Sequence, residues 1–278
     1  MSLLLEACAL RHVYADGSIG LDDCTLAIRP GSRNALLGSN GSGKTTLLQH
    51  FNALLRPTDG QVRFAGQPVD YGRTGLNALR RQVGLVFQNP DRQLFSASVI
   101  EDVSFGPLNL GLDEATVRQR VGQALAAVGM TDLADKPVHH LSFGQKKRVC
   151  IAGVLAMQPA VLLLDEPMAG LDAAMQVELQ GVLDGLTAQG ITIVLSTHDV
   201  DFAYRWADDI HLLAAGRCLA SFAAGDLPQH TLALRTAGQP LPAVVELHRA
   251  LAGHGLGNGM PPRSLDALLA HLTSKETP

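Results

Sequence analysis

The sequence predicts an α/β fold built around a mostly parallel sheet, and three observations support this. Short apolar segments at Ala35–Leu37, Val161–Leu164 and Ile191–Ser196 have the composition of buried strands. Helical patterns follow these segments along the chain, and alternation of strand and helix is typical of parallel sheets. A Gly-rich segment, residues 38–45, follows the first strand and opens a helix. Such a loop predicts phosphate binding at the carboxyl ends of the strands.

The first third of the chain is predicted to be rich in β-structure. Residues 3–37 carry apolar runs broken by Asp-Gly and Pro-Gly turns. After the Gly-rich loop we expect a helix, closed by Pro57 and Gly60, whose apolar positions are Leu47, Leu48, Phe51, Leu54 and Leu55. A hairpin is predicted over 61–69, turning at Ala65-Gly66, and a short buried strand over 83–87.

The middle of the chain predicts a helical insertion over about 89–136. Asp113 and Glu114 start an amphipathic helix there, whose apolar positions are Val117, Val121, Leu125 and Val128. Further helices are expected over 144–157 and 173–186. The last 50 residues predict two short helices, carried by Val244, Leu247, Leu251 and by Leu265, Leu268, Leu269. We interpret them as a small packing extension without chemistry of its own.

The length, net charge and apolar content of the chain limit the functions that it can have. A chain of 278 residues holds one large domain with an appendage, or two modest domains. Its net charge of −4 lacks the basic excess of a nucleic-acid binder, so no nucleic-acid partner is expected. The sequence has no signal-peptide pattern and no apolar run near the roughly 18 residues of a membrane span. Any membrane role is therefore expected to come through a partner.

The four cysteines, Cys8, Cys24, Cys150 and Cys218, are scattered, with no C-x-x-C pair. This favours reduced, mostly buried thiols over a disulfide framework or a zinc site.

The Gly-rich loop, Gly38-Ser-Asn-Gly-Ser-Gly-Lys44-Thr45, fits the pattern G-x-x-x-x-G-K-[ST]. Its glycines let backbone N–H groups turn inward and cradle phosphate oxygens at a helix start. Lys44 supplies positive charge to the β- and γ-phosphates, and Thr45 offers a hydroxyl to Mg²⁺. The alternative is a Gly-Ser turn with an incidental lysine, which the flanking strand and helix disfavour.

Two carboxylates, Asp165 and Glu166, end the apolar strand 161–164. Asp165 is expected on the Mg²⁺ side, and Glu166 is the candidate base that polarises the attacking water. Taken alone, the pair could also be a helix N-cap, because acids favour a helix start. The upstream phosphate loop favours the catalytic interpretation.

Two further polar residues follow strands. His198 comes after the strand next in sequence to the acid pair, so contact with a γ-phosphate is predicted, against an ordinary strand-end histidine. Gln88 ends another strand, and its amide is a candidate ligand for Mg²⁺ or the attacking water.

The segment Leu141-Ser-Phe-Gly-Gln145 places Ser142 and Gly144 at a second helix start, where N–H groups attract anions. A solitary ATPase needs only one such helix terminus. A second one is useful if it caps the γ-phosphate bound by a partner chain. The alternative for these five residues alone is a simple serine N-cap.

These motifs, in this order, resemble those of ABC transporter ATPases over about residues 3–225. The loop matches Walker A, Leu163–Glu166 ends Walker B, Gln88 is the Q-loop glutamine, residues 169–172 are the D-loop and His198 is the switch histidine. The resemblance implies a P-loop NTPase with a RecA-like core, an N-terminal antiparallel β subdomain, a helical subdomain and a small C-terminal helical extension.

The resemblance also implies boundaries and ligands. An ATP-binding domain is expected over 1–227, with the helical subdomain at about 89–157 and the extension over 228–278. ATP and Mg²⁺ are the implied ligands. The implied nucleotide-binding residues are Tyr14, Gly38, Ser39, Asn40, Gly41, Ser42, Gly43, Lys44, Thr45, Thr46, Ser142, Gly144 and Gln145; the catalytic ones are Glu166, His198 and Gln88; the Mg²⁺ ligands are Thr45, Gln88 and Asp165.

Two positions need comment. Tyr14 matches the aromatic that stacks on adenine, against the alternative of an edge-strand tyrosine. Phe143 replaces the first glycine of the family pattern Leu-Ser-Gly-Gly-Gln, and it would be strained if that position needed a positive φ. Gly144 is retained, so we expect function to survive with altered packing at a dimer interface.

The subgroup is indicated by segments that resemble the energy-coupling-factor ATPases: residues 71–76, 86–95, 101–106 and 145–148. Within them, the ATPases of single-purpose cobalt importers are most similar, followed by their nickel counterparts. The resemblance implies a homodimer on the cytoplasmic face of the cell membrane. The dimer would drive an integral membrane scaffold and a metal-binding membrane subunit, with residues 89–106 receiving the scaffold's coupling helices. The C-terminal helices are predicted to pack at the dimer base.

Three other function classes are alternatives for this sequence. A soluble ABC ATPase acting on DNA or ribosomes usually carries two cassettes, a long coiled coil or basic faces, none of which this sequence shows. A P-loop kinase would not explain residues 141–145 or His198. A metal-binding protein is prompted by His139-His140, but adjacent histidines lack the spacing of a helical metal site.

Overall fold

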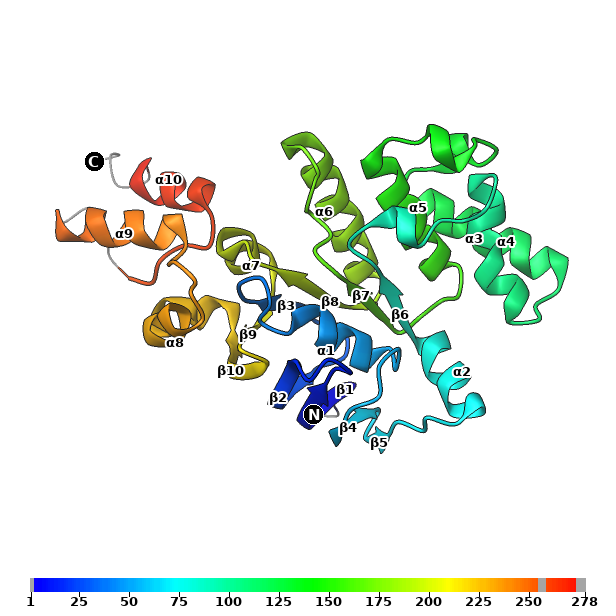
Figure 1. Ribbon diagram of the computed structural model, residues 1–278. Helices are drawn as coiled ribbons and strands as arrows, with labels where there is room; N and C mark the ends of the chain where they lie inside the picture. Colours follow the sequence, from blue (N-terminus) through cyan, green and yellow to red (C-terminus); the bar gives the residue numbers. More distant parts are fainter. Residues whose placement is uncertain (1–2, 255–258, 274–278) are drawn as a thin grey trace.

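The computed structural model describes residues 3–254 and 259–273, and Figure 1 shows their arrangement. Two sheets lie at the centre and base, a group of helices lies to one side, and the C-terminal helices lie to the other. The strands are β1 (Leu5–Val13), β2 (Ile19–Ile28), β3 (Arg33–Leu37), β4 (Asp59–Phe64), β5 (Gln67–Pro68), β6 (Val83–Val86), β7 (Val161–Leu164), β8 (Thr192–Thr197), β9 (Asp209–Ala214) and β10 (Arg217–Ala223). The α-helices are α1 (Lys44–Phe51), α2 (Arg73–Gln82), α3 (Val99–Asn109), α4 (Glu114–Ala127), α5 (Phe143–Leu155), α6 (Ala173–Ala188), α7 (Val200–Trp206), α8 (Thr231–Thr236), α9 (Ala243–Gly253) and α10 (Leu265–Thr273).

The larger sheet has six strands in the order β10-β9-β3-β8-β7-β6. Its strands β9, β3, β8, β7 and β6 pair in parallel, and only β10 pairs antiparallel, at the edge. Every residue of β7 and of β8 is buried, as expected for parallel strands covered on both faces. The predicted α/β class is confirmed. The parallel register brings the carboxyl ends of β3, β7 and β8 to one edge of the sheet.

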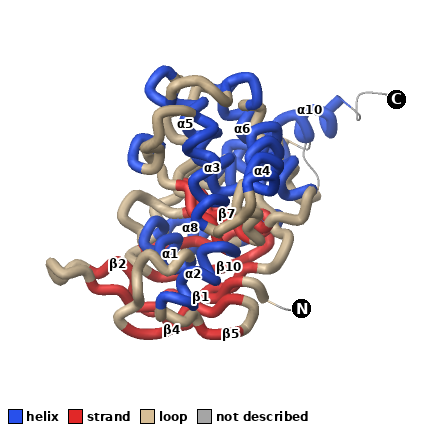
Figure 2. The backbone as a smooth tube through the Cα atoms, turned by 90° about the vertical axis from the view of Figure 1, so that its right-hand side faces the viewer, coloured by secondary structure: helices blue, strands red, loops and turns tan. Residues whose placement is uncertain are grey.

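The smaller sheet is antiparallel, in the order β2-β1-β4-β5. It forms the base of the molecule in Figure 2, where strands lie low and most helices lie above them. The predicted hairpin is present: Ala65 and Gly66 form its turn, both with positive φ, between β4 and β5. This sheet shares a core cluster with one face of the larger sheet through Leu36, Leu163 and Val194.

Side-chain caps fix where the helices of the insertion begin. Ser98 and Glu101 form a capping box at α3, and Asp113 accepts the Thr116 N–H at the start of α4. The predicted amphipathic helix is confirmed, since Val117, Val121 and Leu125 are buried on one face of α4. Among the described residues, no helix is both long and apolar enough to cross a membrane.

The C-terminal helices share a buried core cluster with the larger sheet. Both predicted helices are present, as α9 and α10. Leu234, Val245 and Leu268 belong to the same buried cluster as the strands β3, β7 and β8. The division into an ATP-binding domain over 1–227 and an extension over 228–278 remains a prediction.

Some elements differ from the sequence prediction. Helix α1 ends at Phe51, so Leu54 and Leu55 lie beyond it, and Leu54 is about half exposed. The apolar spacing of the sequence continues past Phe51, but the helix does not, because Ala53, with φ of 51°, turns the chain away from it. The sequence prediction did not include α2, whose only buried residue is Leu79, or the edge strand β10, whose residues are mostly exposed.

All four cysteines are free, as predicted, with Cys24 and Cys150 buried and the other two half-buried. Burial raises the pKa of the Cys24 and Cys150 thiols to about 12, which keeps both protonated.

Two buried histidines predict acid sensitivity of the fold. Burial lowers the pKa of His50 and of His211 from 6.5 to about 4. Between these values the unfolded chain binds protons that the folded chain does not. The free energy of unfolding should therefore fall as pH drops from 6.5 to 4, by about 1.4 kcal/mol per pH unit for each histidine. Urea unfolding across this range measures the slope.

His211 offers a direct variant, because its ring contacts Ser221 and Asn34 inside the core. A His211→Gln chain should lose about half of the histidine contribution to this slope, relative to the native chain. His139→Gln is the matched control, since His139 is exposed. A slope unchanged in His211→Gln would contradict the assignment.

Candidate active site

The phosphate-binding loop connects β3 to α1, and its glycines are required by geometry. Gly41 and Gly43 have φ of 79° and 101°, which disfavour any residue with a Cβ. At Gly38 a Cβ would lie 2.4 Å from the Leu213 carbonyl oxygen. The loop therefore closes tightly over the sheet edge and presents backbone N–H groups at the start of α1.

Lys44 lies inside this loop and is almost fully buried. Its Nζ donates to the Gly38 and Ser39 carbonyl oxygens at 2.7 and 3.1 Å. The same nitrogen is 3.6 Å from Glu166 Oε1. The loop cation and the second acid of the pair are thus brought together.

Asp165 ends β7 and contacts the loop through Thr45. The Thr45 hydroxyl donates to both Asp165 carboxylate oxygens, at 3.0 and 2.8 Å. Ser196, fully buried in β8, donates to Asp165 Oδ1 at 2.6 Å and accepts the Glu166 N–H at 2.8 Å. Ser196 was not among the predicted site residues, although its place two residues before His198 on a buried strand was a usable signal.

Glu166 occupies a strained position. Its φ of 45° is rare for a residue with a Cβ, and such strain costs of order 1–3 kcal/mol. His198 Nδ1 donates to Glu166 Oε2 at 3.0 Å. One oxygen of Glu166 thus lies near Lys44 and the other contacts His198, so the strained backbone holds the carboxylate between the two.

Tyr14 follows β1 and reaches across to α1. Its hydroxyl is 2.8 Å from the Thr46 hydroxyl, and its ring meets His12 edge-on at 4.6 Å. Tyr14 is about one-third exposed. A stacking role for Tyr14 remains a prediction.

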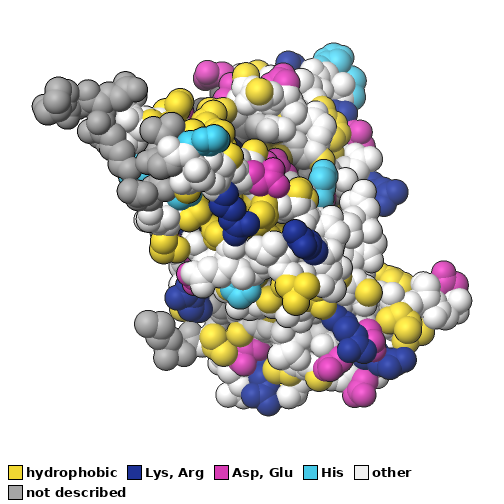
Figure 3. Space-filling model, turned by 90° about the vertical axis from the view of Figure 1, so that its left-hand side faces the viewer, with side chains coloured by type: hydrophobic (Ala, Val, Ile, Leu, Met, Phe, Trp, Pro, Cys, Tyr) yellow, Lys and Arg dark blue, Asp and Glu magenta, His cyan; other side chains and the backbone are white. Residues whose placement is uncertain are grey.

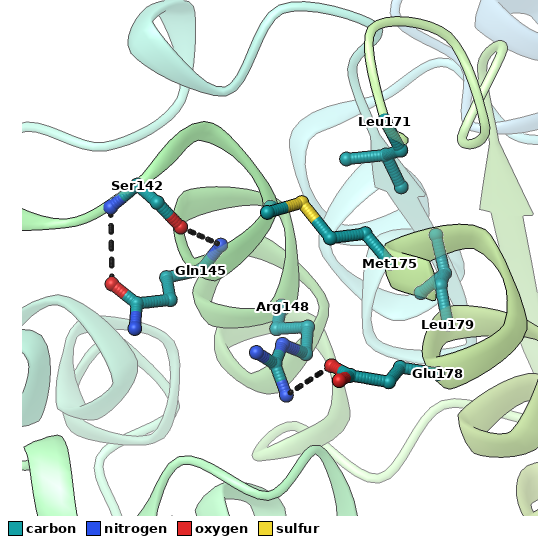
Figure 4. Close-up of a pocket in the computed structure, with 8 residues that line it drawn as sticks. Ser142, Gln145, Arg148, Leu171, Met175, Glu178 and Leu179 are labelled. Carbon is teal, nitrogen blue, oxygen red and sulfur yellow. Dashed lines mark hydrogen bonds and ion pairs between the residues drawn. The ribbon is translucent and has the colours of Figure 1, made fainter. Parts of the chain in front are cut away.

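The second helix start, at α5, is drawn in Figure 4. Ser142 and Gln145 form a reciprocal capping box: the Ser142 Oγ accepts the Gln145 N–H, and Gln145 Oε1 accepts the Ser142 N–H. Met175 of α6 lies against Gly144, where an added Cβ would come within 2.9 Å of its sulfur. Arg148 of α5 pairs with Glu178 of α6. These contacts fix α5 against α6 and leave Ser142 exposed.

Phe143 is the first residue of α5 and has no positive φ, so the strain that the glycine pattern raised does not arise. Its ring packs on Gly170, where a Cβ would lie 3.0 Å away. The Lys147 Nζ lies 5.2 Å from the ring centroid. Phe143 therefore packs the start of α5 against residues 169–172 of the same chain.

Lys147 is a second residue that the sequence prediction missed. Its Nζ donates to three carbonyl oxygens, those of Glu166, Pro167 and Ala169, at 3.2, 2.7 and 2.7 Å. Burial lowers the pKa of Lys147 to about 8. This side chain ties α5 to the loop that follows the acid pair. Its neighbours Lys146 and Arg148 are also basic, so nothing in the sequence distinguished Lys147 from them.

The structure places Gln88 beyond the end of β6. Strand β6 ends at Val86, one residue earlier than predicted, and Gln88 lies exposed beyond it. Within the described part of the chain, no hydrogen bond connects Gln88 to Thr45 or Asp165. Its strand is the neighbour of β7, so both lie at the same sheet edge.

The sequence of the site matches a known family. The family model for the ABC transporter family matches residues 21–169, which include the phosphate loop, the α5 start and the acid pair. The chain belongs to the ABC transporter family. Its homologues are ATPases, so it is an ATP-binding subunit that couples ATP hydrolysis to transport.

Relatives of this ABC ATPase support a narrower group. The cobalt import ATP-binding protein CbiO of Rhodobacter capsulatus is 48% identical over 98% of this chain and 98% of its own length. The energy-coupling factor transporter ATP-binding protein EcfA of Methanocaldococcus jannaschii is 46% identical over 88% of each chain. The predicted resemblance to the energy-coupling-factor ATPases is confirmed.

Solved structures agree with the fold. The structure of cbiO1 from Clostridium perfringens, part of the ABC transporter complex cbiONQ, has a TM-score of 0.77 at 42% identity. It covers 91% of this chain and 98% of that one. A dimeric ATP-binding cassette bound to ADP and Pi has a TM-score of 0.72 at 27% identity, covering 80% of this ABC ATPase and 99% of that cassette. The predicted ABC ATPase fold is confirmed.

The residues of the site fit a nucleotide with a hard divalent cation. Ser42 Oγ and Glu166 Oε1 are buried and have no hydrogen-bond partner among the described residues. Buried polar atoms of this kind are satisfied when a polar ligand binds. Thr45, Asp165 and Ser196 converge as oxygen donors, which is the donor type that Mg²⁺ prefers.

Proposed function

We propose that this ABC ATPase is the motor subunit of an energy-coupling-factor importer for a divalent transition metal, and that the metal is cobalt. The observation that carries the hydrolytic part is the placement of Glu166 between Lys44 and His198. The cargo assignment is supported by the similarity to a cobalt import protein over nearly the whole chain. Nickel, the cargo of a related group, is the alternative.

In the proposed reaction, Glu166 accepts the proton of the water that attacks the γ-phosphate of ATP. His198 orients the carboxylate through the contact to Oε2, and its other ring nitrogen is free to face the phosphate. Lys44 exchanges its bonds to the Gly38 and Ser39 carbonyls for phosphate oxygens, because an ammonium pairs more strongly with an anion than with a neutral carbonyl. Gln88 is proposed to contact the same water or the metal ion.

The residues proposed to hold Mg²⁺ are Thr45, Asp165 and Gln88, the first two already in contact. The bound cation would neutralise charge on the phosphate oxygens. Tyr14 is proposed to stack on adenine, and Thr46 with the phosphate loop to bind the phosphates.

A homodimer is proposed to bind two ATP molecules between its chains. Each ATP lies between the phosphate loop of one chain and Ser142, Gly144 and Gln145 of the other. The exposed position of Ser142 at a capped helix start supports this arrangement, because such a terminus attracts an anion from outside its own chain. ATP then favours the closed dimer and hydrolysis releases it.

A groove of about 500 Å³ supports a membrane partner. It lies between β6, α3 and the end of α5, and its apolar lining includes Leu54, Phe95, Phe105 and Met157. Phe95 and Phe105 meet edge-on at 4.7 Å, and both are more than half exposed. Exposed aromatic side chains around a groove are typical of a surface that receives a partner helix. We propose that coupling helices of the integral membrane scaffold bind here, on the cytoplasmic face of the membrane.

The C-terminal extension is proposed to pack at the base of the dimer. Leu232, Leu247, Met260 and Leu265 are exposed on it. Figure 3 shows hydrophobic side chains spread over the face that carries the extension, some of them on its upper part. Burying such side chains against the same surface of a second copy would stabilise the dimer.

The cargo is tested by cellular uptake of Co²⁺ and Ni²⁺ in cells whose own chain is replaced by the native sequence or by Glu166→Gln. We expect Glu166→Gln to abolish Co²⁺ uptake, because the motor cannot turn over. Loss of Ni²⁺ uptake alone would move the assignment to nickel, and loss of both would indicate a shared carrier. Unchanged uptake of both metals, with ATP hydrolysis by the purified native chain, would contradict the metal cargo and leave the motor assignment intact.

A further inference from the structure

Gln239 of the C-terminal extension lies at the active site, far in sequence from every predicted site residue. Helix α8 ends in a turn where Gly238 has φ of 66°. The Gly238 N–H donates to the Arg235 carbonyl at 3.0 Å and the Gln239 N–H to the Leu234 carbonyl at 2.8 Å. This pair of bonds is a Schellman motif, which fixes the direction in which the chain leaves the helix.

The Gln239 side chain is buried and connects two catalytic loops. With its amide oriented to satisfy both partners, the oxygen accepts the Ser39 N–H at 3.2 Å and the nitrogen donates to the His198 carbonyl at 3.2 Å. Only 7% of the residue is exposed. One side chain therefore joins the first turn of the phosphate loop to the backbone of the switch histidine.

The extension also holds α7, the helix that follows His198. At the start of α7, Asp201 accepts the Ala243 N–H of α9 at 2.7 Å. At its end, Arg263 donates to the carbonyl oxygens of Tyr204 and Ala207. The Tyr204 hydroxyl in turn donates to the Pro261 carbonyl at 3.0 Å. Helix α7, which follows His198, is thus held at both ends by Ala243, Pro261 and Arg263.

We propose that Gln239 is a positioning residue for ATP hydrolysis, which holds His198 in register with the phosphate loop. Its two bonds connect the Ser39 and His198 backbones, and the His198 side chain in turn contacts Glu166. The bonds that hold α7 keep His198 in this position when ATP binds to the phosphate loop. The inference rests on the roles proposed above for Glu166 and His198 and does not depend on the cargo.

A loss of register affects turnover more than nucleotide binding. The phosphate cradle is built from the loop's own backbone and Lys44, so ATP affinity should change little without Gln239. His198 would sample positions in which its contact to the γ-phosphate is lost. We expect the lost positioning to cost about as much as one hydrogen bond of ordinary strength, which corresponds to a decrease in kcat of about 3- to 10-fold.

The test compares Gln239→Met with the native full-length chain, in the native background and in a His198→Ala background. Met keeps the size of the side chain and removes both hydrogen bonds. We expect kcat to fall about 3- to 10-fold, with KM for ATP within about 2-fold, in the native background only. In the His198→Ala background Gln239→Met should lower kcat no further, because two residues that act through one contact are not additive. Gln119→Met, on the exposed side of α4, is the matched control.

Three results would overturn the inference: a native kcat for Gln239→Met, an effect confined to KM, or an equal fold-decrease in the His198→Ala background. The last would mean a merely structural role. If Gln239→Met does not fold, Gln239→Glu serves instead, since it keeps the acceptor for Ser39 and lacks the donor to His198; a native kcat for it overturns the proposal. A native kcat for His198→Ala itself would overturn the catalytic assignment as well, whereas a defective His198→Ala beside a native Gln239→Met overturns only this inference.

Discussion

Replacing Glu166 by Gln is expected to lower kcat for ATP hydrolysis by about 10²–10⁴-fold, the usual value of a positioned general base. Glutamine keeps the size of the side chain and its contact with His198, but it cannot accept the proton of the attacking water. ATP binding should be retained, because Lys44 and the loop backbone are unchanged. The measurement is single-turnover hydrolysis together with equilibrium binding of ATP.

Two further results complete this experiment. Glu114→Gln, a change of the same chemistry at an exposed residue of α4, should leave turnover native. With ATP bound and unhydrolysed, the Glu166→Gln chain should accumulate as a dimer, seen by light scattering as a doubled mass. Native turnover by Glu166→Gln would contradict the assignment of the base.

The second large effect is expected from charge at the start of α5. Ser142→Asp should lower ATP-dependent dimerisation of the Glu166→Gln chain by more than about 100-fold, because a carboxylate would face the γ-phosphate of the partner's ATP. Aspartate and asparagine are equally good N-caps, so both keep the cap that Ser142 supplies to Gln145. Ser142→Asn therefore isolates the charge from the fold.

We expect Ser142→Asn to dimerise within about 10-fold of the parent chain, and both variants to unfold at the native urea concentration. Sedimentation equilibrium with and without ATP gives the dimer affinity. Equal dimerisation of Ser142→Asp and Ser142→Asn would mean that this helix start does not face a phosphate, and the proposed sandwich would be wrong.

The sequence was sufficient to predict the parts of the site that depend on local chain geometry. The loop at 38–45, the acids after β7 and the histidine after β8 each follow a buried strand, and parallel pairing must bring strand ends together. The strand Val161–Leu164 was predicted at its observed limits because its apolar run is bounded by Pro159 and by the acids.

Contacts between distant segments could not be predicted in the same way. Lys147 and Gln239 carry no motif, and their importance comes from which carbonyl or amide groups lie opposite them in the folded chain. The strained φ of Glu166 could not be predicted either, because no glycine or turn signal in the sequence marks this position. Helix α2 was missed because its apolar contribution is nearly confined to Leu79.

Lys147 has a consequence for how the two nucleotides in the proposed dimer communicate. Its Nζ donates to the loop after Glu166, which is proposed to contact the chain's own nucleotide, and Lys147 belongs to α5, whose start is proposed to face the nucleotide of the other chain. A shift of either surface must displace the other, since three carbonyl oxygens share one ammonium. In the proposed dimer, this shared ammonium would couple the state of one ATP to the state of the other.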